Sequence, residues 1–313
     1  MNIKLLATLT GLSLSFSVAS AFATNTSANK PSGKWPGKSL VGYITAYGST
    51  IPPNVTNQMV AESINNHYNV FVYAFGSINK QNNVSMPSGI TKIDFTDQIN
   101  NIHQNKGIAL VSFGGQNNTF LPNPDDAIQA ADNTAAILKQ YNLDGIDLDL
   151  ESIDVDSNYL EQYIGELRNM NPNIILTAAP QIAGGYGGPA QLAPTSIFTQ
   201  NFITNANFDA LLIQEYNQYA GAVFDGKQDT DEGFITASFT PLTQIIPNRT
   251  KIIIGEPANS SAGTGLSNPN LVLSDIQSGG VLDNNQYGGI MTWALNYDYT
   301  QNWSFANGVY SVI

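Results

Sequence analysis

The chain has 313 residues, 42% of them hydrophobic, and its 24 acidic against 12 basic side chains give a formal net charge of −12. This acidic balance argues against nucleic acid or an anionic membrane surface as a partner, because both would be repelled. The absence of cysteine excludes disulfides, thiolate nucleophiles and zinc–sulfur sites, and two histidines are too few for most histidine-based metal sites.

Residues 1–23 are predicted to form a secretory signal peptide. The single early cation Lys4 precedes an apolar run over residues 5–18, and small residues at A-x-A spacing lead to Ala23. That run is too short to span the ~30 Å of a bilayer core as a membrane anchor. We expect cleavage near Ala23 and secretion to the periplasm or the extracellular space. Residues 24–37 form a polar leader, and residues 38–313 form a single domain.

Apolar segments rich in β-branched residues recur at intervals of roughly 30–40 residues after the leader. Their near-continuous hydrophobicity is typical of strands buried on both faces. Eight such strands are predicted, at residues 40–45, 70–75, 107–113, 144–150, 174–179, 210–216, 251–255 and 288–293.

Helical spacing occurs between several of these strands. One pattern runs from residue 128 to 138 and a second from 160 to 167, with Asp156 or Ser157 able to cap the second helix. Strands alternating with helices over this length favour the α/β class and a (β/α)8 TIM barrel. An open doubly wound sheet is the competing architecture, but no G-x-G-x-x-G loop follows the first strand. The apolar positions of the two helical patterns are Ile128, Ala131, Ala135 and Leu138, and Leu160, Tyr163, Ile164 and Leu167.

The fourth predicted strand carries three carboxyls at alternate positions, Asp147, Asp149 and Glu151. Successive side chains of a strand point to opposite faces, so the three acids share one face and the aliphatic residues between them share the other. Three like charges in a barrel interior must raise at least one pKa, which suits a proton donor. Glu151 lies last and is the expected donor, with Asp149 hydrogen-bonded to it and Asp147 beneath. A calcium loop and a solvated acidic loop are disfavoured by the aliphatic residues in between.

The segment D-G-I-D-L-D-L-E at residues 144–151 resembles the D-x-x-D-x-D-x-E signature of family 18 glycoside hydrolases, which include bacterial and plant class III chitinases. Further segments match the same family in the same order, so the resemblance covers residues 39–300. They are S-F-G-G at 112–115, L-T-A-A-P-Q at 176–181, Q-E-Y-N at 214–217, G-E-P-A at 255–258 and G-G-I-M-T-W at 288–293.

The resemblance implies a retaining, substrate-assisted hydrolysis of N-acetylglucosamine polymers. Glu151 would protonate the glycosidic oxygen, and the acetamido carbonyl of the substrate would attack the anomeric carbon. Asp149 would orient the acetamido N–H, and Tyr216 would hydrogen-bond the acetamide oxygen. Trp293 would form the floor under the sugar, whose C–H faces suit an aromatic plane. Core packing is the alternative reading of Tyr216 and Trp293.

Five further residues are expected to contact substrate. Gln214 has the strand parity of Tyr216, and Asn217 follows at the strand end, where it could meet substrate hydroxyls. Ser112, Gly114 and Gly115 are expected to support the acidic strand instead of touching sugar. The remaining positions that match residues lining the family's cleft are Tyr43, Phe75 and Gln181.

The match departs from the plant relatives at Glu215 and Glu256, where apolar residues are usual. By parity Glu215 should face the helices, which is costly for an unpaired carboxylate. One of the two could instead act as a second acid at the active site.

The sequence therefore predicts a secreted chitinase. The alternative within the same chemistry is an endo-β-N-acetylglucosaminidase acting on glycoprotein or peptidoglycan glycans. A chitin-binding lectin that has lost activity is a third hypothesis. The expected partners are chitin or N-acetylglucosamine oligosaccharides, the expected state is a monomer, and no metal or organic cofactor is implied.

Overall fold

The computed structural model describes residues 35–46, 53–152, 154–185, 188–218 and 221–313. The predicted signal peptide and most of the polar leader therefore lie outside the described residues. Within them, no helix is both long enough and apolar enough to pass through a membrane.

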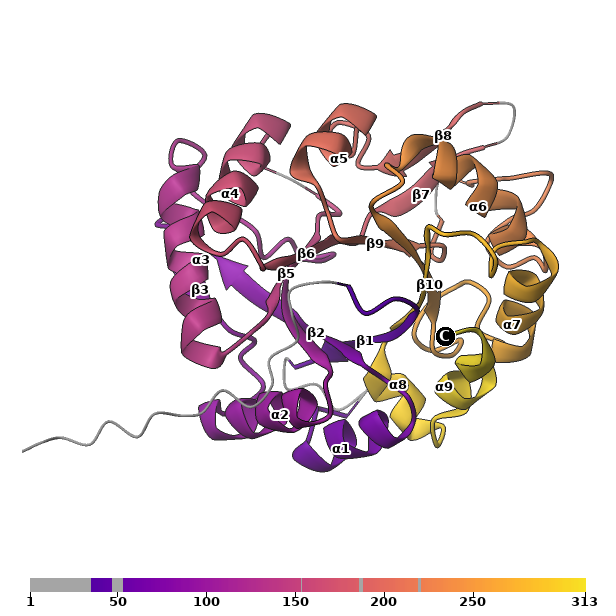
Figure 1. The fold of residues 1–313 in the computed structure, drawn as a ribbon, viewed down its shortest axis with the longest axis horizontal. Coiled ribbons are helices and arrows are strands. Elements are labelled where there is room, and N and C mark those ends of the chain that lie inside the picture. The colour runs from indigo at the N-terminus through magenta and orange to yellow at the C-terminus, as the bar shows by residue number, and fades with distance from the viewer. Residues whose placement is uncertain (1–34, 47–52, 153, 186–187, 219–220) are drawn as a thin grey trace, which may run out of the picture.

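Parallel strands form a closed barrel at the centre of the molecule (Figure 1). Strand β1 pairs with both β2 and β11, and β10 pairs with both β11 and β9, which closes the ring. All eight predicted strands are found, so the (β/α)8 prediction is confirmed. The barrel strands are β1 (Ser39–Thr45), β2 (Val70–Ile78), β4 (Ile108–Gly114), β5 (Gly145–Asp149), β6 (Ile175–Ala178), β9 (Ala210–Gln214), β10 (Lys251–Pro257) and β11 (Tyr287–Trp293).

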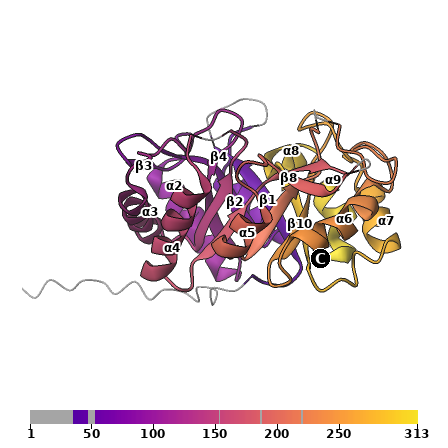
Figure 2. The same cartoon turned by 90° about the horizontal axis from the view of Figure 1, so that it is seen from above.

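Helices surround the strands in Figure 1 and again lie outside them in the view turned by 90° in Figure 2. Several of them begin at a side-chain cap; the Asp156 carboxylate, for example, accepts from the Tyr159 amide at the start of α4, as predicted. The helices are α1 (Asn57–Asn65), α2 (Lys92–Gln104), α3 (Ala127–Tyr141), α4 (Ser157–Met170), α5 (Gln200–Ala206), α6 (Phe234–Ile245), α7 (Pro269–Ser278), α8 (Leu295–Thr300) and α9 (Ser304–Val309), followed by the 3-10 turn η1 (Tyr310–Val312).

The buried face of helix α3 differs from the one that its apolar spacing predicts. Ala131 and Leu138 are buried, but Ile128 is exposed and Ala135 is only partly buried. Thr134 occupies the inner face instead, because its hydroxyl is satisfied there by the Ala130 carbonyl and the Tyr163 hydroxyl. The face predicted for α4 is correct throughout.

Three short strands add to the barrel and were not predicted. Strand β3 (Val84–Ser85) pairs antiparallel with the end of β2. Strands β7 (Gln181–Gly184) and β8 (Ala190–Ala193) form a hairpin, and β7 meets β9 at Gln181 and Gln214. Both additions extend past the carboxyl ends of barrel strands, which is where active sites of this fold lie.

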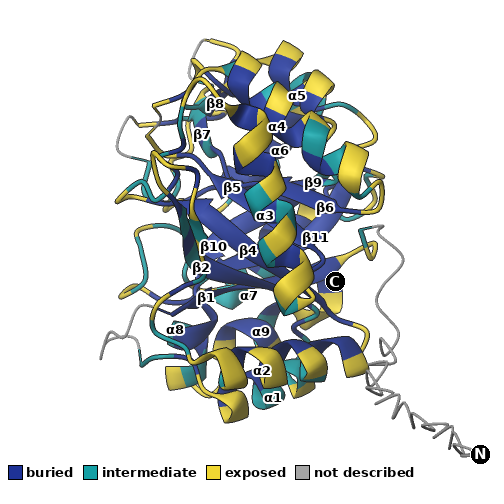
Figure 3. Cartoon of the chain, turned by 90° about the vertical axis from the view of Figure 1, so that its left-hand side faces the viewer, coloured by how far each residue is buried: buried dark blue, intermediate teal, exposed yellow. Residues whose placement is uncertain are grey.

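The core has two layers. The larger lies between the barrel and its helices, and the smaller fills the barrel interior with residues such as Val72, Leu110 and Met291. Figure 3 shows the buried strands enclosed by helices whose outer faces are exposed. On β5 the strand alternation places Ile146 and Leu148 in the outer layer, so the acidic face points into the barrel.

Candidate active site

A cavity of about 700 Å³ lies at the carboxyl end of the barrel strands. Barrel strands, the connections after them and the added strands β3 and β7 all contribute to its wall. The described residues that line it are Phe75, Ser77, Ser85, Met86, Ser88, Gly114, Gln116, Asn117, Thr119, Asp149, Glu151, Gln181, Gln214, Tyr216, Asn217, Ala262 and Trp293.

Asp147 lies below this cavity, fully buried in the barrel interior. Three hydroxyls from three other strands, β1, β4 and β6, donate to its carboxylate, and together they hold it in place. Burial raises its pKa, while these hydrogen bonds act in the opposite direction. The donors are Tyr43 at 2.7 Å, Ser112 at 2.6 Å and Thr177 at 2.7 Å.

Asp149 forms the bottom of the cavity and is 5% exposed. Its Oδ1 accepts a hydrogen bond of 3.0 Å from the Gln214 side-chain amide. Burial, followed by the nearby charges of Glu151 and Asp147, raises its pKa well above the ordinary range. No hydrogen bond joins Asp149 to Glu151 in the described part of the chain. The expected bond is missing because β5 ends at Asp149 and the side chain of Asp149 is held by Gln214 across the barrel.

Glu151 stands two residues beyond the end of β5, exposed to the cavity. The surrounding protein removes part of its water, which raises its pKa. A carboxyl that keeps its proton at higher pH and is open to a cavity can donate that proton to a bound molecule. Asp149 also lines the cavity but is nearly buried and held by Gln214, so Glu151 is the most accessible of the three acids.

The end of β4 supports the acidic strand through Gly114 and the residue that follows it, Gly115. A Cβ on Gly114 would lie 1.9 Å from the Asp149 carbonyl oxygen, and Gly114 has a φ of +118°. Both the close contact and the positive φ exclude any other residue at this position. The Gly115 amide donates to the same oxygen at 2.7 Å. With the Ser112 bond to Asp147, these contacts agree with the supporting role expected of this segment.

Aromatic rings form one side of the cavity. Trp293, at the end of β11, stacks on Phe75 with ring centroids 5.9 Å apart and an interplanar angle of 22°. Tyr43 was expected to line the cavity too, but it is 1% exposed and lies beneath Trp293 with its hydroxyl bonded to Asp147. Tyr43 does point into the barrel, but its position there is too deep for it to reach the cavity.

Tyr216 faces the cavity from the end of β9, and its hydroxyl makes no hydrogen bond to any residue that the structure describes. Burial and the nearby charges of Asp149 and Glu151 raise its pKa well above 10, so the phenol is a neutral donor. Gln214 lies behind it, with its amide shared between Asp149 and the Ala179 carbonyl at 2.8 Å.

Asn217 and Gln181 also line the cavity, as expected. The Asn217 side-chain oxygen accepts from the Thr264 amide at 2.8 Å, so this oxygen is already engaged. The side-chain nitrogen is the group that Asn217 retains for a bound molecule.

Part of the cavity wall was not predicted from the sequence. Ser85, Met86 and Ser88 come from the β3 region, and Gln116 and Asn117 follow β4. No hydrophobic periodicity marks such residues. The only available signal was their position directly after predicted strands, which is where the loops of a barrel meet.

Glu215 and Glu256 do not line the cavity and so cannot supply a second acid there. Both are fully buried and each has one carboxyl oxygen with a partner, since Glu215 accepts from Ser238 at 2.9 Å and Glu256 from the Leu266 amide at 3.0 Å. The other oxygen of each is buried without a partner in the described residues. Burial raises the pKa of Glu215 to about 8 and that of Glu256 well above 4.5.

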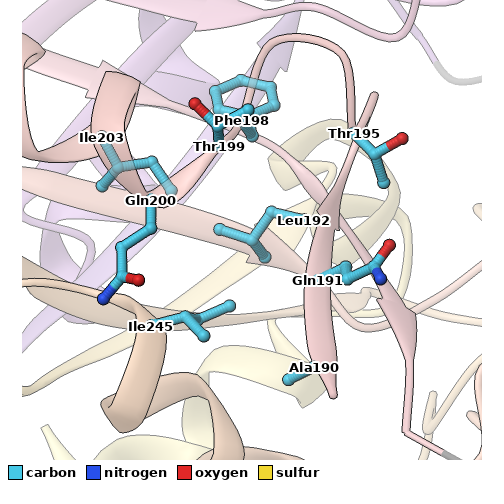
Figure 4. Close-up of a pocket in the computed structure, with 9 residues that line it drawn as sticks. All are labelled: Ala190, Gln191, Leu192, Thr195, Phe198, Thr199, Gln200, Ile203 and Ile245. Carbon is cyan, nitrogen blue, oxygen red and sulfur yellow. The ribbon is translucent and has the colours of Figure 1, made fainter. Parts of the chain in front are cut away.

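A second cavity, of about 320 Å³, lies between β8, α5 and α6 (Figure 4). Its lining is apolar or uncharged, including Leu192, Phe198 and Gln200, so it contains no group for acid–base chemistry. Across the described ranges, no group of three or more acidic, histidine or cysteine side chains is arranged to hold a metal ion.

Comparisons with known proteins identify the family to which the chain is similar. A family model described as glycosyl hydrolases family 18 matches residues 39–220. Endochitinase 37 of Trichoderma harzianum is 31% identical over 202 residues, which cover 55% of this chain and 57% of that protein. The chain therefore spans a little over half the length of the first curated relatives that it matches.

Solved structures share the fold at lower identity. A family GH18 chitinase from Chromobacterium violaceum is similar with a TM-score of 0.72 and 20% identity, covering 90% of this chain and 86% of that one. A xylanase and α-amylase inhibitor protein from Scadoxus multiflorus has a TM-score of 0.65 and 20% identity, covering 88% and 98%. By their names, one of these barrels is an enzyme and the other an inhibitor, so the fold alone does not assign an activity.

Proposed function

Because the chain belongs to glycosyl hydrolases family 18, we propose that it hydrolyses β-1,4 bonds between N-acetylglucosamine units of chitin. The observation that carries this proposal is the position of Glu151. This carboxyl opens into the cavity with a raised pKa, beside the buried Asp149 and the neutral phenol of Tyr216. A proton donor, a second carboxyl and a hydroxyl donor thus face one space.

The carboxylates favour a substrate-assisted route. Asp149 and Glu151 are the only acids among the described residues lining the cavity, and both come from one strand and the residues just after it. An orthodox glycosidase instead places two carboxyls on opposite sides of the scissile bond. With no opposing carboxyl in the described lining, an acetamido oxygen held near the anomeric carbon is the better nucleophile, because an intramolecular group has a high effective concentration.

In the proposed first step, Glu151 gives its proton to the glycosidic oxygen as the bond to the anomeric carbon breaks. The acetamido carbonyl oxygen attacks that carbon and forms a cyclic oxazolinium ion. Asp149 accepts a hydrogen bond from the acetamido N–H and stabilises the positive charge, and the Tyr216 hydroxyl donates to the acetamide oxygen. Trp293 packs against the sugar face.

In the second step, the Glu151 carboxylate takes a proton from water, which attacks the anomeric carbon and reopens the ring. Two displacements at one carbon retain its configuration. Asp147 remains buried beneath and fixes the strand through its three hydroxyl donors. The proposed substrate contacts, besides Trp293, come from Gln181, Gln214, Asn217 and Phe75.

The test is turnover of a chitin tetramer or pentamer by the protein lacking residues 1–23, with early product anomers resolved. We expect release of the β-anomer, unaffected by EDTA. Release of the α-anomer would reject the retaining route. Binding without cleavage would indicate a lectin, and cleavage of glycopeptides or peptidoglycan fragments alone would indicate the endo-β-N-acetylglucosaminidase.

We also propose that the protein is secreted as a monomer after cleavage near Ala23. The support is the sequence pattern of residues 1–23, with its early cation, apolar run and small residues. Amino-terminal sequencing of the exported protein and its mass in solution test both statements. An uncleaved amino terminus on the exported protein would reject the signal peptide.

A further inference from the structure

One wall of the cavity is attached to Glu256, a buried acid of β10 whose side chain does not line the cavity. Residues 262–266, here the 262–266 segment, follow β10 and bring Ala262 to the cavity. The segment packs against the residues that follow β9, among them the proposed active-site residues Tyr216 and Asn217.

The contacts with β9 are close. The Asn217 amide donates to the Thr264 carbonyl at 2.6 Å, and the Thr264 amide donates to the Asn217 side-chain oxygen at 2.8 Å. Gly265 lies so near Tyr216 that an added Cβ would come within 2.7 Å of the tyrosine Cβ. The orientation of Asn217 and the space around Tyr216 therefore depend on where this segment lies.

Glu256 holds the far end of the segment. Its Oε2 accepts from the Leu266 amide at 3.0 Å and would lie 2.9 Å from a Cβ on Gly265. Leu266 itself is buried, with 2% exposed. A buried amide without an acceptor is costly, so the Glu256 carboxyl fixes the backbone at this point.

We propose that Glu256 is a positioning residue, which holds the 262–266 segment against Tyr216 and Asn217 and so shapes the substrate wall of the cavity. The kinetic part of this inference rests on the proposed function; the structural part does not. Glu256 does not line the cavity, so it acts through the segment and not on the substrate.

The surroundings of Glu256 favour its neutral form. The charged groups that act on it are Glu215 on β9, Asp229 in the connection after β9, and Asp275 on α7, and all three are acidic. Burial and these charges raise its pKa, and a neutral carboxyl still offers its carbonyl oxygen to Leu266. A glutamine at this position keeps such an oxygen, whereas a methionine of similar length does not.

The experiment compares Glu256→Gln, Glu256→Met and the control Glu215→Met by amide hydrogen exchange and by kinetics on a chitin tetramer. Glu215 is buried equally on the neighbouring strand, but its partner is Ser238 on α6 and not the segment. We expect Glu256→Met to speed exchange in the 262–266 segment and to raise KM about tenfold, the effect of losing one hydrogen bond of about 1.4 kcal/mol. Its kcat should change less, because Glu151 and Asp149 lie across the barrel.

Glu256→Gln should restore wild-type exchange and KM, and Glu215→Met should leave the segment protected. Equal effects of Glu256→Met and Glu215→Met, or no rescue by glutamine, would overturn the proposal. If Glu256→Met does not fold, Glu256→Thr, whose side chain is too short to reach Leu266, replaces it with the same expectations. Absence of wild-type turnover would reject the proposed function, while exchange would still decide whether Glu256 holds the segment.

Discussion

Two groups of acids lie in different places relative to the barrel wall. Asp147 and Asp149 on β5 point inward and Glu151 just after β5 faces the cavity, and donors from other strands reach the first two. Glu215, just after β9, and Glu256 on β10 are buried away from the cavity, each with one oxygen unpartnered in the described residues. Burial raises the pKa in both groups. A raised pKa alone therefore does not distinguish a candidate proton donor from a buried acid; access to a cavity does.

The largest expected difference between the two groups is kinetic. Glu151→Gln replaces the proposed proton donor, and we expect kcat on a chitin tetramer to fall by ~10²–10⁴-fold. Glu215→Gln should leave kcat unchanged, since this side chain lies outside the cavity. Equal losses in the two variants would remove the distinction between the groups. Circular dichroism of both proteins serves as the folding control.

The second difference is in stability against pH. The pKa of Glu215 is raised from 4.5 to about 8, so the folded protein binds more protons than the unfolded chain between these values. The contribution of Glu215 to the free energy of unfolding is therefore fully present below pH 4.5 and is lost as pH rises toward 8, by up to about 1.4 kcal/mol per pH unit.

Urea unfolding of wild type and Glu215→Gln from pH 4.5 to 8 measures this slope. The free energy of unfolding of the variant should fall less steeply with pH, by the contribution of one carboxyl. Glu151→Gln should change the slope less, because water reaches Glu151 in the cavity. Parallel curves for wild type and Glu215→Gln would show that Glu215 ionises normally in the folded protein.

The smallest expected difference comes from removing one hydroxyl donor from each group. Ser112→Ala takes one of three donors from Asp147, and Ser238→Ala takes the donor of Glu215. Each should cost about 1–3 kcal/mol of unfolding free energy in urea titration. Only Ser112→Ala should also lower kcat, because Asp147 lies under the acidic strand. A fall in kcat for Ser238→Ala would link the outer acids to the chemistry.

The sequence predicted those features that depend on local periodicity. Each of the eight barrel strands is a short apolar run, and alternation along β5 identified the inward face of Asp147 and Asp149. Strands β3, β7 and β8 are short and defined by their partners, so no periodicity marks them. Ile128 was misplaced because the buried hydroxyl of Thr134 has partners that only the folded structure reveals.

The sequence indicates which side chains on a strand face into the barrel. It does not indicate how far each of them lies from the cavity. Tyr43 points into the barrel, but its ring does not reach the cavity. How far a ring reaches depends on the shift of each strand relative to its neighbours, and that shift is set by strand pairing. Met86 and Gln116 enter the wall from connections whose paths depend on tertiary contacts. The Asp149–Gln214 bond joins residues 65 positions apart and has no local sequence signal.

The pairing of β1 with β11 has a consequence for how the protein folds. The first and last barrel strands are neighbours, so closing the ring brings together residues near positions 40 and 290. Such non-local contacts incur their loop-closure entropy before they are stabilised, which slows folding. Phe75 and Trp293 meet only when the ring is closed. In a refolding experiment, recovery of turnover should therefore lag behind recovery of helical signal.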